Sequence, residues 1–193
     1  MKRSTSRGEQ AKAPAFFLDR DGTINVDHVY ISDPLKIELI PGAAAAIRRA
    51  NDAGFKVVVV SNQSGIGRGL IDAAKMPEIH ARLDELLAGE AGAKIDAYEF
   101  CPHHPDDSCA CRKPGTKLVT EAAERLGIAL ERSFFVGDSW VDVECGRNAG
   151  LKSILVRTGK GAETEHSQLL TQVPDHVAAD LAAAIEWALR GAY

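Results

Sequence analysis

Two acidic residues, Asp19 and Asp21, directly follow the apolar run AFFL at residues 15–18. In an extended segment residues i and i+2 share a face, so the two carboxylates are predicted to converge on one point. At a separation of ~4 Å and an effective dielectric of ~20, their repulsion is about 4 kcal/mol. Mg²⁺ offsets such repulsion, because it binds one or two carboxylates together with waters and phosphate oxygens. Asp138, at the end of a later apolar run, is the expected third ligand, and Asp142 lies one helical turn beyond it, behind the ligands.

A simpler interpretation of the same pair is that Asp19 and Asp21 form a turn and cap the start of a helix. Ser61 and Asp138 argue against it, because each of them also follows an apolar run. Small and acidic side chains at the ends of three such runs favour one site assembled from separate segments of the chain.

The segment FCPHHPDDSCACRKPG, residues 100–115, holds three of the four cysteines of the chain. Its potential metal ligands form two pairs, each with one residue between its members, so both members of a pair point to one side of a locally extended chain. Together they supply three thiolates and an imidazole, which is a tetrahedral ligand set for zinc. The predicted zinc ligands are Cys101, His103, Cys109 and Cys111, with His104 pointing the other way.

Two alternatives to zinc binding are a disulfide and free buried thiols. A reducing compartment disfavours disulfides, and Cys109 and Cys111 are too close in sequence to bridge without strain. Four protein ligands leave no open coordination position, whereas catalytic zinc keeps one. The zinc is therefore predicted to be structural and to hold Arg112 and Lys113, which follow the last ligand, beside the acidic site. In the competing hypothesis, a catalytic zinc hydrolase, zinc chelation abolishes turnover at once.

Alternating apolar runs and helical patterns must position these residues. Strands are predicted at 15–18, 55–61, 95–100, 133–138 and 152–157, and helices include 42–54, 72–88 and 178–190. Strands that are apolar throughout indicate a parallel sheet covered by helices on both faces, a Rossmann-like, doubly wound α/β fold. Such sheets bind ligands at the carboxyl ends of their strands, where the acidic and small residues lie.

A chain of 193 residues, 45% hydrophobic and 26% charged, is typical of one globular domain. That domain is predicted to span residues 14–193, with the zinc loop at 101–111 and a flexible N-terminal tail at 1–13. The net charge of −4 argues against a nucleic-acid partner. No apolar run reaches the ~20 residues of a membrane helix, and the N-terminus does not resemble a signal peptide. We therefore expect a cytoplasmic monomer without a membrane partner, in which the isolated Cys145 is a buried, unreactive side chain.

Four segments, DRDGT, VVSNQSG, RKP and FVGDSWVD, resemble in this order the four motifs of the haloacid dehalogenase-like superfamily. The resemblance implies a phosphatase in which Asp19 is the nucleophile and Asp21 the general acid and then the general base. Ser61 and Lys113 would stabilise the phosphoryl group, and Mg²⁺ would bind Asp19, Asp21 and Asp138. Too few residues separate these motifs for a large cap domain, so the site is expected to be open and closed only by loops.

A second set of motifs resembles the family of D-glycero-D-manno-heptose 1,7-bisphosphate 7-phosphatases over residues 14–161. The motifs are GTINVDH, SNQSGIGRG, the CxCRKP end of the cysteine segment, and VRTGKG. The resemblance implies removal of the 7-phosphate from a precursor of ADP- or GDP-heptose and lipopolysaccharide. The implied substrate contacts are Asp27, His28, Tyr30, Ser61, Asn62, Gln63, Ser64, Arg112 and Lys113. A short zinc loop and Val29, where relatives often have glycine, are departures in the loops that face the substrate.

Three other functions compete with this one. Histidinol-phosphate phosphatase is a sister activity with the same type of zinc loop. A polynucleotide 3′-phosphatase shares the motifs, but the acidic balance of the chain argues against it. A non-catalytic metal-binding scaffold is disfavoured because Asp19, Asp21, Ser61, Lys113 and Asp138 are all retained together.

Overall fold

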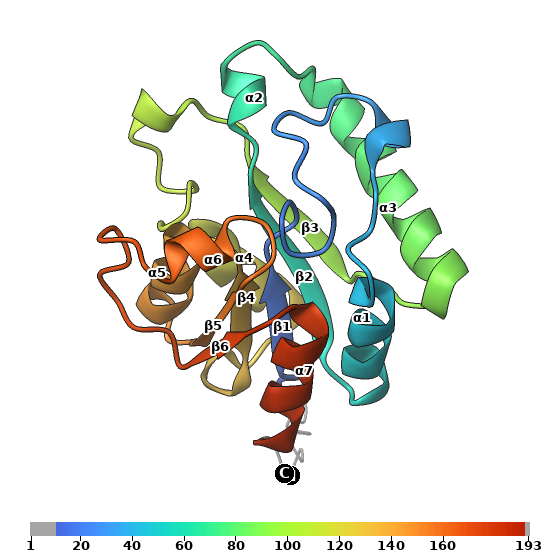
Figure 1. Cartoon of the computed structure of the whole chain (residues 1–193), viewed down its shortest axis with the longest axis vertical. Helices are drawn as coiled ribbons and strands as arrows, with labels where there is room; N and C mark the ends of the chain where they lie inside the picture. The colour runs from blue at the N-terminus through green and yellow to red at the C-terminus, as the bar shows by residue number, and fades with distance from the viewer. Residues whose placement is uncertain (1–10, 192–193) are drawn as a thin grey trace, which may run out of the picture.

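A parallel sheet of six strands forms the centre of the computed structural model, which describes residues 11–191 (Figure 1). The strands are β1 Ala15–Leu18, β2 Lys56–Asn62, β3 Ala97–Cys101, β4 Phe134–Gly137, β5 Lys152–Val156 and β6 His176–Ala178. Their order across the sheet is β3-β2-β1-β4-β5-β6, with every neighbouring pair parallel. In this order β1 lies between β2 and β4, and the winding of the chain reverses there. The reversal opens a crevice at the carboxyl ends of β1 and β4, which is the position where sheets of this type bind ligands.

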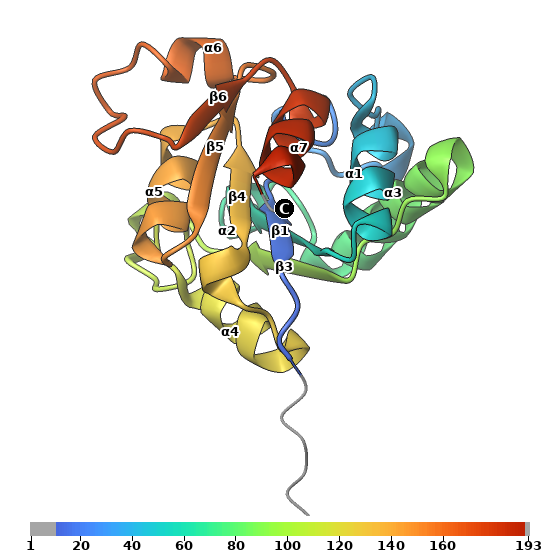
Figure 2. The same cartoon turned by 90° about the horizontal axis from the view of Figure 1, so that it is seen from below.

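Helices cover both faces of the sheet, as Figure 2 shows from below. On one face lie α1 Ala43–Asp52, α3 Met76–Ala91 and α7 Leu181–Arg190, which share a core with inward side chains of the strands. On the other face, α4 Lys117–Leu126 and α5 Trp140–Asn148 enclose a second core that contains Cys145. Because both faces are buried, β1 and β4 are apolar at every position, and the site at their ends rests on a rigid base.

Short helical turns connect the larger elements and lie mostly around the carboxyl edge of the sheet. They are η1 Pro34–Lys36, α2 Ser64–Gly67, η2 Ala73–Lys75, η3 Pro105–Asp107, η4 Leu130–Arg132 and α6 Gly161–Thr164. None of the helices described in residues 11–191 is long and apolar enough to cross a membrane.

The predicted fold class and the five predicted strands are confirmed, and the structure adds a sixth strand, β6. This strand has three residues and pairs only with β5 at the edge of the sheet, so it carries no extended apolar run. Of the predicted tail, residues 1–10 lie outside the described part of the chain. Ala13, the last residue of that tail, forms a parallel bridge with Ile128.

Candidate active site

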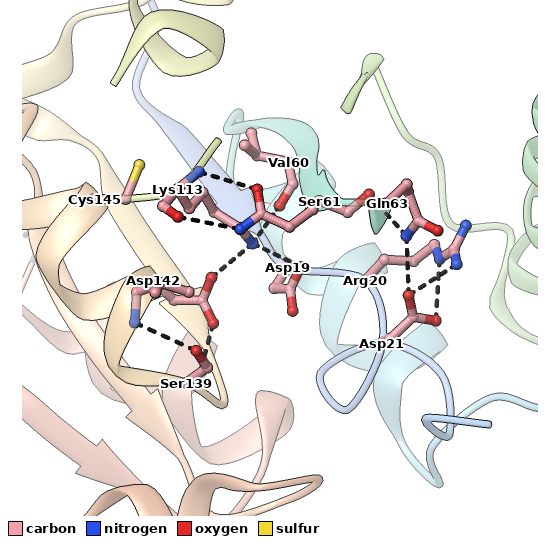
Figure 3. Close-up of polar contacts among 12 residues, drawn as sticks. Asp19, Arg20, Asp21, Val60, Ser61, Gln63, Lys113, Ser139, Asp142 and Cys145 are labelled. Atoms are coloured by element: carbon pink, nitrogen blue, oxygen red, sulfur yellow. Dashed lines mark hydrogen bonds and ion pairs between the residues drawn. The ribbon is translucent and has the colours of Figure 1, made fainter. Parts of the chain in front are cut away.

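Asp19 is the first residue after β1 and lies at the floor of the crevice (Figure 3). Its backbone N–H donates to the carbonyl of Val136 in β4 at 2.9 Å, so the sheet itself fixes its position. The chain then turns sharply, because the carbonyl of Arg20 accepts from the N–H groups of Ile24 and Asn25. Residues 19–25 are therefore a tight turn and not the extended segment expected from the sequence.

The Lys113 ammonium is the central cation of the site and is 2% exposed. It lies 2.7 Å from Asp19 Oδ1, 2.6 Å from Asp142 Oδ1 and 2.7 Å from the carbonyl oxygen of Val60. Burial alone would lower the pKa of Lys113, but the charges of Asp142 and Asp19 outweigh it and hold the pKa above its ordinary value. The ammonium is thus protonated and available to neutralise negative charge at Asp19.

Asn62, at the end of β2, holds Lys113 in this place. Its Oδ1 accepts from the Lys113 backbone N–H at 3.0 Å, and its Nδ2 donates to the Lys113 carbonyl at 3.2 Å. Both ends of the Asn62 amide are therefore used to tie the loop after the cysteine cluster to the sheet. Asn62, predicted as a substrate contact, thus also positions Lys113 in this structure.

Asp138 and Asp142 complete an acidic cluster with Asp19, and their carboxylate oxygens lie within 4.8 Å of one another. Asp142 is held by a capping box with Ser139 at the start of α5. Burial raises the pKa of Asp19 to about 7 against the opposing charge of Lys113, and burial together with the charge of Asp19 raises the pKa of Asp138 to about 7. When all three carboxylates are ionised, Lys113 leaves two negative charges uncompensated, and the charge and oxygen donors fit a hard divalent cation such as Mg²⁺.

The Asp21 carboxylate is not part of this cluster, which differs from the predicted set of Asp19, Asp21 and Asp138. Its oxygens accept hydrogen bonds from Arg20, Asn25 and Gln63 at 2.8–3.2 Å. Burial would raise the pKa of Asp21, but the charge of Arg20 and these hydrogen bonds outweigh it and hold the pKa below its ordinary value. In the absence of substrate the Asp21 side chain is therefore a carboxylate, and its direction is set by Arg20.

Two glycines with positive φ lie directly against Asp138. A Cβ on Gly22 (φ 83°) or on Gly159 (φ 55°) would approach Asp138 Oδ2 to 2.1 Å, well inside van der Waals contact. The backbone N–H of Lys160, the next residue, donates to the same oxygen at 2.8 Å. These two loops thus form a narrow slot that fits the Asp138 carboxylate only because both residues lack a side chain.

Four side chains of the cysteine segment converge as the sequence predicts: Cys101, His103, Cys109 and Cys111. The distances between their Sγ and Nδ1 atoms run from 3.2 to 3.6 Å. Around a tetrahedral zinc, ligand atoms at the usual bond lengths lie about 3.5–3.8 Å apart, so the donor set and its spacing fit that ion. None of the four cysteines of the chain, including the buried Cys145, forms a disulfide.

A cavity of about 280 Å³ opens above Asp19 at the carboxyl edge of the sheet. Of the predicted substrate contacts, those that line it are Asp27, Tyr30, Asn62, Gln63, Ser64, Arg112 and Lys113. Two others lie elsewhere: His28 is beside Glu38, and Ser61 is 2% exposed and accepts a hydrogen bond from Gln63. The cavity therefore combines an acidic floor with cations on its walls.

Two further residues act on the site and were not predicted from the sequence. Lys160 lines the cavity, and its ammonium lies 3.0 Å from Asp27 Oδ2, which joins two loops at the mouth. The segment TGKG after β5 could have indicated this role for Lys160, because it places a lysine between glycines at the carboxyl end of a strand. Arg20 is 1% exposed, and no local sequence pattern indicates that this charged residue is buried.

Comparison with known proteins identifies this arrangement. Residues 110–184 match the model of the HAD-hydrolase-like family. A D-glycero-D-manno-heptose-1,7-bisphosphate 7-phosphatase of Thermosynechococcus vestitus is 43% identical over 185 residues, covering 90% of this chain and 94% of that protein. The corresponding D-glycero-beta-D-manno-heptose enzyme of Pseudomonas aeruginosa is 45% identical over 148 residues, covering 76% and 83%. The chain is a phosphatase of the haloacid dehalogenase-like family.

A solved structure supports the same assignment for this phosphatase. The D,D-heptose 1,7-bisphosphate phosphatase of B. bronchiseptica, complexed with magnesium and phosphate, has a TM-score of 0.84 and 38% identity. The match covers 92% of this chain and 99% of that one. The predicted superfamily and the predicted phosphatase activity are thereby confirmed.

Replacing Gly159 by alanine is expected to reduce kcat/KM of the phosphatase by about 30-fold or more. The added Cβ displaces the Asp138 carboxylate from the acidic cluster, and in enzymes a displacement of about 1 Å within a site costs on the order of 100-fold. Gly54→Ala is the matched control, because Gly54 also has a positive φ (81°) but a Cβ there meets nothing within 4 Å. Equal losses in the two variants would show that backbone strain, and not the slot around Asp138, limits activity.

Proposed function

We propose that this phosphatase hydrolyses phosphate monoesters with Mg²⁺ and forms a covalent aspartyl-phosphate on Asp19. The observation that carries the proposal is the position of the Asp19 carboxylate, which lines the cavity, lies 2.7 Å from the Lys113 ammonium and is within 4.8 Å of an Asp138 oxygen. A nucleophilic carboxylate needs neutralising charge around it when it attacks an anionic phosphoryl group. Lys113 is placed to supply that charge from the protein side.

Asp19, Asp138 and Asp142 are the residues that would hold Mg²⁺, which when bound neutralises charge on the phosphoryl oxygens and the attacking carboxylate. Asp142 also pairs with Lys113 and thereby fixes the ammonium beside Asp19. The resemblance also implies a role for Asp21 at the ion. Its carboxylate is engaged by Arg20, so any such contact requires a different group of that residue or a different rotamer.

The reaction on this chain has two halves. In the first, an Asp19 oxygen bonds to phosphorus while the bond to the leaving alcohol breaks. Asp21, which is a carboxylate without substrate, takes up a proton when the anionic phosphate enters the site and gives that proton to the departing oxygen. In the second, Asp21 accepts a proton from a water molecule, which attacks phosphorus and releases phosphate from Asp19. Lys113 contacts Asp19 in the structure and stabilises the charge in both halves. The resemblance also implies a hydrogen bond from Ser61 to the phosphoryl oxygens, and because Ser61 is 2% exposed and lies outside the cavity lining, that bond requires the site to rearrange when substrate binds.

We further propose that the substrate is D-glycero-D-manno-heptose 1,7-bisphosphate, which loses its 7-phosphate on the route to ADP- or GDP-heptose and lipopolysaccharide. The names of the relatives support this substrate, and so do the cations on the cavity wall. Nη1 of Arg112 is buried and has no hydrogen-bond partner among residues 11–191. A guanidinium with a free N–H beside the cavity suits a second phosphate, which Arg112 can bind through two parallel hydrogen bonds.

The substrate assignment predicts a preference of about 100-fold or more in kcat/KM for heptose 1,7-bisphosphate over histidinol phosphate. A 100-fold preference corresponds to about 2.7 kcal/mol, within reach of one bidentate phosphate contact. Steady-state kinetics on both compounds measure this preference. Arg112→Met should reduce the preference, because it lowers kcat/KM for heptose 1,7-bisphosphate and not for histidinol phosphate. A preference for histidinol phosphate would reject the substrate and leave the proposed chemistry standing.

We propose that Zn²⁺ binds Cys101, His103, Cys109 and Cys111 and has a structural role. Four ligands from the chain close the coordination sphere, and the last of them is followed at once by Arg112 and Lys113. The ion would hold this loop against the cavity, where Asn62 fixes its other end.

Cys109→Ser is expected to lower bound zinc below one ion per chain and to reduce kcat/KM by about 10-fold or more, while Asp19-dependent turnover persists. The expected loss reflects looser placement of Arg112 and Lys113 and not loss of a reacting group. Elemental analysis together with kinetics at saturating Mg²⁺ measures both effects, and Cys145→Ser, outside the cluster, is the control. Complete loss of turnover in a folded variant, restored in proportion to added zinc, would instead indicate a catalytic zinc.

A further inference from the structure

We propose that Arg20, assisted by Gln63, is a positioning residue that holds Asp21 as the base for the second half of the reaction. This inference rests on the proposed aspartyl-phosphate route. Arg20 is 1% exposed and is not among the residues that line the cavity, so it does not reach the substrate. Its guanidinium instead forms a bidentate pair with the Asp21 carboxylate, in which Nε donates to Oδ1 at 3.2 Å and Nη2 donates to Oδ2 at 2.8 Å (Figure 3).

The remaining acceptor positions of the Asp21 carboxylate are filled as well. Asn25 Nδ2 donates to Oδ1 at 2.9 Å, and Gln63 Nε2 donates to Oδ2 at 3.1 Å. A carboxylate has about four such positions, so in this arrangement none is left for a proton of its own. Without substrate, the geometry is that of a base held ready, and for the first half of the reaction Asp21 must exchange one of these donors for the proton that it gives to the leaving group.

Gln63 is the donor that an incoming molecule can reach. Of the three residues that donate to Asp21, Gln63 alone lines the cavity, and its Nε2 is shared with Ser61 Oγ at 3.2 Å. A water molecule in the cavity can insert between the two groups, accepting from Gln63 Nε2 and donating to Asp21 Oδ2, and lie within reach of the phosphoryl group. Arg20 and Asn25 keep the carboxylate aligned while that water enters.

The burial of Arg20 is not explained by stability. Its Nη1 is buried without a hydrogen-bond partner among the described residues 11–191. A buried guanidinium with an unsatisfied N–H carries an uncompensated desolvation cost. A residue retained for packing alone would be apolar at this position, whereas alignment of Asp21 requires a rigid fork with two parallel N–H groups.

The test is a rapid-quench experiment with p-nitrophenyl phosphate on Arg20→Lys and Gln63→Met. The p-nitrophenolate group leaves without a proton, so formation of the phosphoenzyme does not need Asp21, whereas its hydrolysis does. For Arg20→Lys, which keeps the charge and loses the fork, we expect hydrolysis of the phosphoenzyme to slow by about 30-fold or more, with formation within threefold of wild type. For Gln63→Met, the loss of one hydrogen bond is expected to slow hydrolysis by about fivefold. Both variants then release a burst of p-nitrophenolate larger than that of the wild type.

Arg82→Lys in α3 is the matched control, because Arg82 pairs with Glu85 on the surface. The proposal is overturned if formation and hydrolysis fall together, or if hydrolysis is unchanged in the folded variants. If Arg20→Lys does not fold, Gln63→Met tests the proposal instead, since the Gln63 side chain faces the cavity. If the ratio of the rate constants for phosphoenzyme formation and hydrolysis is unchanged in Gln63→Met, the alignment of Asp21 by its donors is contradicted. Asp19→Asn distinguishes a failure of this inference from a failure of the proposed function. If a phosphoenzyme still forms in Asp19→Asn, the proposed function itself is rejected.

Discussion

Asp19→Asn is expected to lower kcat by at least about 10⁴-fold, with the fold and the metal content of the cysteine cluster retained. The carboxamide has nearly the shape of the carboxylate but is not a nucleophile, and removal of a covalent nucleophile costs enzymes on the order of 10⁴ to 10⁶ in kcat. Steady-state turnover of p-nitrophenyl phosphate with saturating Mg²⁺ measures the effect.

Asp142→Asn is the comparison for this variant. It removes one charge from the same cluster and the same lysine but leaves the nucleophile intact. We expect it to retain more activity than Asp19→Asn. If Asp19→Asn kept turnover within about tenfold of wild type, another residue would have to attack phosphorus.

Lys113→Met is expected to lower both activity and stability. Lys113 is buried between Asp19 and Asp142, and without its ammonium these carboxylates face each other with no cation of the chain between them. Removal of one partner of a buried ion pair costs about 3–5 kcal/mol of folding free energy. Turnover should fall by at least about 10²-fold, because the variant loses the charge that we propose to stabilise the phosphoryl group.

Chemical denaturation with and without Mg²⁺ tests this account of Lys113. Part of the lost stability should return with Mg²⁺, since a divalent ion compensates the same carboxylates. Lys113→Met combined with Asp142→Asn is the matched control, which removes one charge of each sign and should be more stable than Lys113→Met alone. A single variant as stable as the wild type in the absence of metal would contradict the ion-pair network.

The fold and the location of the site followed from short-range patterns in the sequence. Apolar runs that end in Asp19, Ser61 and Asp138 indicate a parallel sheet whose carboxyl edge is the site, and the structure has that edge. The cysteine and histidine spacing likewise predicts which side chains converge, because two-residue periodicity holds in locally extended chain.

Side-chain directions within the site depended on tertiary contacts that no local pattern encodes. The same two-residue rule failed for Asp21, because the turn at Arg20 and the burial of its guanidinium redirect the carboxylate. Asp142 joins the acidic cluster and pairs with Lys113, which is 29 positions earlier in the chain. This pairing depends on the packing of α5 against the sheet. His28 matches the family motif, yet it lies beside Glu38.

The stereochemical course at phosphorus tests the central claim, a covalent intermediate on Asp19, most directly. A phosphate monoester made chiral at phosphorus with sulfur and oxygen isotopes is hydrolysed in isotopically labelled water, and the configuration of the released thiophosphate is determined. Each in-line displacement inverts phosphorus, so attack by Asp19 followed by attack of water predicts overall retention. Overall inversion would mean a single displacement by water, and it would contradict the role assigned to Asp19.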